Sequence, residues 1–148
     1  MIKIIMRIIA DLHIHSRYSR ATSPDMNIDA IAIWAKKKGI NLVGTGDFTH
    51  PKYFSSIKEK LEPAGNGLFV LKQDSKSIYF ILTAEVSNIY KQGDKTRKIH
   101  NLIFAPSFEA VEKINAEFSK RGNVISDGRP IFGFTAQGLI KIVLDASP

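Results

Sequence analysis

The stretch Ile8-Ile9-Ala10-Asp11-Leu12-His13-Ile14-His15-Ser16 continues an apolar run from Ile4 and contains two histidines separated by one residue. The run predicts a first strand over residues 2–11. Side chains of an extended segment alternate with a period of two, so His13 and His15 leave the backbone on the same side. Two imidazoles at the end of a buried strand suit one divalent metal ion, although histidines bonded to water or backbone would give the same pattern.

The composition limits the chain to a few classes of protein. With 148 residues, 44% hydrophobic and 24% charged, it can form one globular domain. It has no cysteine, so disulfides, zinc ribbons and thiol catalysis are excluded, and any metal ion must be held by His, Asp or Glu. Its apolar runs are far shorter than the ~18–20 residues of a membrane span, and its start does not resemble a signal peptide. We therefore expect a cytoplasmic protein with no membrane partner.

The charge is strongly basic. Lys and Arg number 21 against 14 Asp and Glu, a formal net charge of +7. Such a surplus favours polyanionic partners, nucleic acid first. The alternative is that a Lys- and Ile-rich composition reflects the amino-acid usage of the organism.

Apolar runs of strand length alternate with amphipathic helical segments, which indicates an α/β fold. After a polar loop at 12–24, helices are predicted over 28–38, 52–61, 107–120 and 136–145, with N-caps at Asn27, Ser107 and Thr135. Strands are predicted over 40–45, 68–72 and 77–86, followed by a hairpin of 87–92 and 97–104. Turns are predicted over 63–67 and at Asp127-Gly128.

Histidines and carboxylates recur at or near the predicted strand ends, where catalytic groups converge in parallel β/α folds. They are His13, His15, Asp47, His50, Glu85 and His100, which include every histidine of the chain. Each has a simpler explanation when taken alone. Asp47 could cap a helix, Glu85 could form an ion pair, and His100 could be a core histidine.

The residue types suit metal-assisted phosphoester chemistry. A glutamate between two histidine-bearing segments can bridge two metal ions about 3.5–4 Å apart, the spacing used in phosphoester hydrolysis. Imidazole and carboxylate ligands without thiolate suit zinc, with manganese, magnesium or iron as alternatives.

Several of these strings resemble the first motifs of the PHP (polymerase and histidinol phosphatase) family. They are Asp11-Leu12-His13-Ile14-His15-Ser16, Gly44-Thr45-Gly46-Asp47-Phe48-Thr49-His50-Pro51, Glu85 and His100. Longer strings are similar to the archaeal endonuclease Q branch of that family and its bacterial relatives. They cover residues 15–23, 98–103 and 125–130.

The resemblance implies the N-terminal part of a distorted (β/α)7 TIM-like barrel with a metal cluster at the carboxyl ends of its strands. In that cluster His13, His15 and Glu85 hold one ion, Glu85 and His100 hold a second, and His50 serves a third. Asp47 orients His50 or touches a metal. The implied catalytic residues are His13, His15, Glu85 and His100.

The same resemblance implies DNA repair, by a metal-dependent endonuclease that nicks DNA 5′ to uracil, hypoxanthine, xanthine or abasic sites. The expected phosphate contacts are basic residues in loops that flank the ligands, namely Arg17, Arg20, Lys91, Lys95, Arg97 and Lys98. Tyr18 or Phe48 could stack on an extruded base, with plain packing as the alternative. Two other functions remain open: a small-molecule phosphoesterase like histidinol phosphatase, and a catalytically incomplete fragment.

The chain departs from the family pattern in two places. The segment 17–20 lacks a further histidine that many members carry. The family's later ligands and the cysteine-bearing zinc module of endonuclease Q have no counterpart, and a barrel takes about 250 residues. We therefore expect residues 1–148 to be a single partial PHP domain, with any sliding-clamp contact made by the missing parts.

Overall fold

The computed structural model describes residues 7–147, with only the backbone described at residues 76 and 77. Over this range the chain is a mixed α/β fold with an open sheet, in agreement with the predicted class. Its helices are α1 (Ile28–Lys38), α2 (Pro51–Lys60), α3 (Phe108–Ser119) and α4 (Ala136–Ala146). Its strands are β1 (Ala10–Asp11), β2 (Leu42–Gly44), β3 (Leu61–Gly65), β4 (Leu68–Leu71), β5 (Asp74–Gln92), β6 (Lys95–Ala105) and β7 (Ile131–Phe132).

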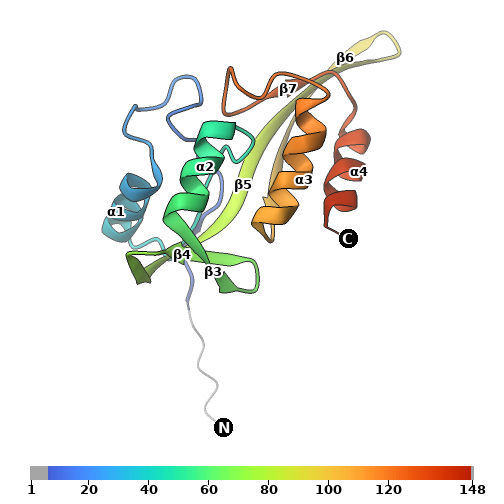
Figure 1. Ribbon diagram of the computed structural model, residues 1–148. Coiled ribbons are helices and arrows are strands. Elements are labelled where there is room, and N and C mark those ends of the chain that lie inside the picture. Colours follow the sequence, from blue (N-terminus) through green and yellow to red (C-terminus); the bar gives the residue numbers. More distant parts are fainter. Residues whose placement is uncertain (1–6, 148) are drawn as a thin grey trace.

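Strand β5 organises the sheet and crosses the whole molecule (Figure 1). Its first half lies between β2, which is parallel to it, and β4, which is antiparallel, in the order β1-β2-β5-β4-β3. Its second half forms a long antiparallel hairpin with β6 and pairs briefly in parallel with β7. One strand therefore joins the parallel part of the sheet to the hairpin.

The helix boundaries follow the predicted caps. The side chains of Asn27, Ser107 and Thr135 each accept a hydrogen bond from the backbone N–H three residues later, which satisfies a free donor of the first turn. Gly39 ends α1 in the left-handed conformation, with φ 70°. Helix α2 begins at Pro51, and its N-cap His50 makes no side-chain capping bond.

Three strand predictions need correction. The first strand covers only Ala10–Asp11 of the residues described, and the predicted part at 2–6 lies outside them. The turn predicted over 63–67 is narrower, because Leu61–Gly65 forms β3. The strand predicted over 77–86 continues to Gln92, because β6 supplies hydrogen-bonding partners where β2 ends.

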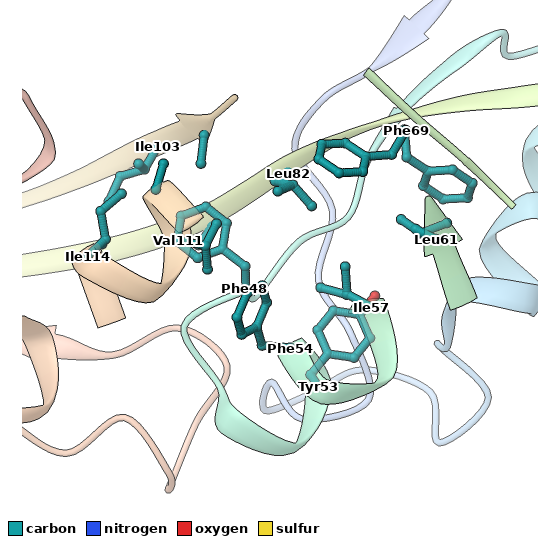
Figure 2. Packing of buried hydrophobic residues seen from close by; sticks show 14 of the residues in the cluster. Phe48, Tyr53, Phe54, Ile57, Leu61, Phe69, Leu82, Ile103, Val111 and Ile114 are labelled. Carbon is teal, nitrogen blue, oxygen red and sulfur yellow. The ribbon is translucent and has the colours of Figure 1, made fainter. Parts of the chain in front are cut away.

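The core lies on one side of β5, where alternate side chains meet the helices (Figure 2). Phe80, Leu82, Ala84 and Val86 are fully buried, together with Val111 of α3. Full burial of each large side chain is worth about 1.5–3 kcal/mol. The intervening residues of β5, Glu85 among them, project from the opposite side of the strand. The apolar face thus fixes the position of a polar one.

None of the helices in the described part of the chain is long and apolar enough to cross a membrane.

Candidate metal centre

The parallel pairing of β1, β2 and β5 brings the predicted residues to one rim. Asp11 pairs with Val43, so the histidines after β1 lie beside the segment that follows β2. Gly44 pairs with Ile81, and Glu85 lies four residues further along β5. The predicted position of Glu85 at a strand end is wrong, since it lies inside β5. It nevertheless lies beyond the carboxyl end of β2, where ligands gather in α/β sheets.

Two glycines allow the close approach of these segments. A Cβ on Gly44 would lie 2.6 Å from both the Leu12 carbonyl oxygen and Thr83 Oγ1. A Cβ on Gly46 would lie 2.5 Å from the Ile14 carbonyl oxygen, and its φ of +68° is itself a conformation that favours glycine. The string Gly44-Thr45-Gly46 therefore lets the segment after β2 pack directly against the histidine segment.

His13, His15 and Glu85 form a compact set of three side chains, here called the ligand group. Glu85 Oε2 lies 2.9 Å from His13 Nε2 and 3.0 Å from His15 Nε2. One ligand atom from each residue lies within 4.8 Å of the other two. His100 Nδ1 contacts Glu85 Oε1, the second carboxylate oxygen. Three imidazoles from two segments therefore surround one carboxylate.

The ligand group fits a divalent metal ion. Ligand atoms about 2.0–2.1 Å from a tetrahedral zinc ion lie about 3.3 Å from one another, so small movements would admit an ion. The contact of His100 with Glu85 Oε1 lacks hydrogen-bond geometry, and within the described residues this buried oxygen has no hydrogen-bond donor. Glu85 is 3% exposed, while His13 and His100 are 53% and 54% exposed. The group is thus anchored from below and open to solvent above.

Asp47 holds His15. Its Oδ1 lies 3.0 Å from His15 Nδ1, and its Oδ2 accepts hydrogen bonds from Ser16 N (2.6 Å), Ser16 Oγ (2.7 Å) and Ser19 Oγ (2.9 Å). Asp47 is 0% exposed, and its left-handed φ of 45° turns the carboxylate toward the loop after β1. Sequence reasoning placed Asp47 on a metal or on His50, but the structure places its side chain against His15. This bond makes His15 Nδ1 the donor and leaves the Nε2 lone pair facing Glu85.

The network shifts the ionisation of its members. The hydrogen bond to Asp47 raises the pKa of His15 above its ordinary value, despite partial burial. Burial acts to raise the pKa of Asp47, but the bonds from His15, Ser16 and Ser19 outweigh it and lower that pKa. Burial likewise opposes ionisation of Glu85, and its contacts with His13 and His100 lower its pKa overall. Both carboxyl groups are therefore charged at neutral pH.

His50 lies apart from the ligand group. It is 4% exposed, and its ring stacks on Tyr18 with centroids 4.2 Å apart. Its Nε2 lies 3.0 Å from the Ile125 carbonyl oxygen, which can only accept, so Nε2 donates and Nδ1 carries the lone pair. Among the described residues that Nδ1 has no hydrogen-bond partner. Tyr18 is therefore occupied by His50, and Phe48 is fully buried in the core, so packing accounts for both aromatics.

The segment 125–130 is a part of the site that sequence reasoning treated only as a turn. A Cβ on Gly128 would lie 2.4 Å from Asp47 Oδ2, so only glycine fits over this carboxylate. Gly128 N donates to the Tyr18 carbonyl oxygen at 2.9 Å, and its own carbonyl oxygen accepts from Thr49 Oγ1 at 2.9 Å. Arg129 Nη1 lies 3.8 Å from Glu85 Oε2. The sequence signal was a glycine beside charged residues in an otherwise polar loop.

The predicted phosphate contacts lie in two places. Arg17 and Arg20 are in the loop after β1, where Arg20 Nε is 3.4 Å from Asp127 Oδ2. The other four lie on the arms of the β5–β6 hairpin and not in loops, because the hairpin is longer than predicted: Lys91, Lys95, Arg97 and Lys98.

The fold is similar to that of endonuclease Q, a class of DNA endonuclease. The lesion-specific endonuclease from Pyrococcus furiosus matches with a TM-score of 0.78 and 31% identity over 94% of this chain and 32% of that one. A solved complex of endonuclease Q with a 27-mer duplex substrate carrying an abasic lesion at the active site has a TM-score of 0.78 and 33% identity, over 93% and 32%. These matches support a relationship to DNA-repair nucleases.

In sequence, an uncharacterised protein of Methanocaldococcus jannaschii is 38% identical over 136 residues, which cover 91% of this chain and 14% of that protein. No family model matches the chain. The chain thus spans about a third of the length of the endonuclease Q structures and about a seventh of this relative.

Proposed function

We propose that the chain carries the metal centre of a DNA endonuclease of the endonuclease Q kind, a metal-dependent phosphodiester hydrolase. The observation that carries this proposal is the convergence of His13, His15 and His100 on the buried Glu85, in a fold similar to that of a lesion-specific endonuclease. The basic net charge of +7 agrees with a nucleic-acid partner.

The proposed roles follow from the contacts. His13, His15 and Glu85 hold one ion, and Glu85 with His100 reaches a second. Asp47 is a positioning residue that acts through His15, and the lone pair of His50 Nδ1 is available to a further ion. A divalent metal bound here would lower the pKa of a water and polarise a phosphoryl oxygen. The donor set favours zinc, with manganese, magnesium or iron as alternatives.

The open side of the ligand group sets the direction of approach of the substrate. The exposed edges of His13 and His100 leave room for an extended phosphodiester chain. Arg129, beside Glu85 Oε2, supplies a cation to a phosphate bound at that edge. Lesion-containing DNA is proposed as the substrate, with uracil, hypoxanthine, xanthine or an abasic site as the lesion, because one similar structure holds duplex DNA with an abasic lesion.

The wider architecture is proposed on the same basis. Residues 1–148 form one unit of a (β/α)7 PHP barrel, whose remaining strands and zinc module belong to a larger assembly. A sliding clamp would bind those other parts. Cytoplasmic location remains a prediction.

End-labelled duplexes with a uracil, hypoxanthine or abasic site, and an undamaged control, provide the test. We expect nicking 5′ to the lesion that requires Zn²⁺, Mn²⁺ or Mg²⁺, stops with EDTA and is lost in Glu85→Gln. The matched control Glu112→Gln removes an exposed carboxylate and should retain activity. Faster hydrolysis of p-nitrophenyl phosphate than of lesion DNA would favour a small-molecule phosphoesterase, and metal binding without any hydrolysis would favour an incomplete fragment.

A further inference from the structure

The hairpin of β5 and β6 reaches beyond the helices at one end of the molecule (Figure 1). Its pairing is regular from Leu82↔Ala105 to Gln92↔Lys95. Residues 91–98 are all exposed, and they contain four cations against one acid, Asp94. The hairpin is therefore a basic arm that starts at the metal centre.

The register divides the cations of this arm between two faces. Directly paired residues of an antiparallel ladder share a face, and successive pairs alternate. The Ser87↔His100 pair shares the face of Glu85, and so does the Ile89↔Lys98 pair. The next pair on this face is Lys91↔Thr96. Lys91 and Lys98 therefore lie on the face of the metal centre, which we call the metal-side face.

Lys95 and Arg97 lie on the opposite face, as side-chain contacts show independently of the register. Arg97 Nε donates to Gln92 Oε1 at 3.1 Å. Asn101 Nδ2 donates to Asn88 Oδ1 at 2.8 Å further down the same face. This face leads toward the helix-covered core and away from the ligand group.

We propose that Lys91 and Lys98 form a track of phosphate contacts that holds DNA on the metal-side face, while Lys95 and Arg97 take no part. This inference rests on the proposed function, because it assumes that the metal centre acts on DNA. Along the strand, Lys98 lies about 7 Å and Lys91 about 13 Å from His100, at about 3.3 Å per residue. At 3.4 Å per nucleotide, these cations reach phosphates about two and about four nucleotides from the metal centre.

Two double variants with the same loss of charge test the track. Lys91→Gln/Lys98→Gln and Lys95→Gln/Arg97→Gln are compared with the wild-type chain by fluorescence anisotropy, on a duplex with a stable abasic-site analogue at several salt concentrations. The metal-side pair should weaken binding about 5–10-fold and reduce the slope of log affinity against log salt by about two. The opposite pair should change affinity by less than about twofold.

Metal titration of both variants should match the wild-type chain, which shows that the site has not moved. Equal losses in the two variants would overturn the proposal and leave a basic arm without a preferred face. No loss in either, or no DNA binding by the wild-type chain, would also overturn it. A wild-type chain that binds DNA through the metal-side face without nicking it would instead contradict the proposed function alone.

Discussion

The two sides of Glu85 are built in opposite ways. On one side, Asp47 is completely buried, and both of its oxygens are bonded to His15, Ser16 and Ser19 under the cover of Gly128. On the other side, the β5–β6 hairpin leaves its cations exposed. A buried charge is tolerated only with full hydrogen bonding, which fixes its geometry, whereas an exposed lysine costs little and stays free for a partner. The buried side therefore sets the positions of the ligands, and the exposed side is suited to bind a polyanion.

Glu85 joins the two sides, so its loss should have the largest effect. Glu85→Gln keeps the shape of the side chain and removes the charge that three imidazoles contact. We expect metal affinity to fall more than about 100-fold, because even residues that only support ligands contribute about 10–100-fold. Isothermal titration with Zn²⁺ or Mn²⁺ measures this. Affinity within threefold of the wild type would remove Glu85 from the metal centre.

Asp47→Asn tests whether the buried side positions a ligand. The amide cannot accept all the hydrogen bonds of the carboxylate, and His15 loses its charged partner. Metal affinity should fall about 10–100-fold, and the unsatisfied donors should cost about 1–3 kcal/mol of stability. Titration and urea unfolding measure the two effects. A loss of affinity as large as that of Glu85→Gln would indicate that Asp47 binds the metal directly.

Gly128→Ala tests the cover of the buried side. The added Cβ would lie 2.4 Å from Asp47 Oδ2 and 2.6 Å from Ser19 Oγ, so the loop must shift. We expect a loss of about 1–3 kcal/mol in the free energy of unfolding, as for other overpacked sites. Gly133→Ala is the matched control, because a Cβ there has no neighbour within 4 Å. Equal unfolding midpoints for the two variants would contradict this account.

The smallest expected effect concerns the pH dependence of stability through His50. Burial lowers the pKa of this imidazole, and the bond to the Ile125 carbonyl oxygen only partly opposes it. The folded state then binds this proton less tightly than the unfolded state, so stability should fall as pH drops from about 6.5 toward the lower folded pKa.

His50→Gln should flatten this decline. Melting temperatures of the two chains between pH 8 and pH 5, with EDTA present, measure the difference. The raised pKa of His15 acts in the opposite direction, but equally in both chains, so it cancels. Parallel curves would show that burial of His50 does not govern its ionisation.

The sequence predicted what depends on local pattern. Asn27, Ser107 and Thr135 cap helices as expected, and the spacing of His13 and His15 placed two imidazoles together. It could not predict features that depend on contacts between distant segments. The partner of Asp47 follows from a left-handed backbone turn, and the need for Gly128 from a carboxylate 81 residues earlier.

The hairpin illustrates the same limit. Alternating and charged residues predicted its two strands, but which cations share the face of Glu85 depends on the register with β6. Its length was also missed, because nothing local separates a strand that ends at Val86 from one that changes partners and continues.

The most direct test of the metal centre is a crystal structure of the chain soaked with Zn²⁺ or Mn²⁺, with an anomalous difference map. We predict an anomalous peak bound by Nε2 of His13, Nε2 of His15 and the Glu85 carboxylate, with Asp47 still bonded to His15. An empty ligand group at saturating metal, or an ion held only elsewhere on the surface, would contradict the account.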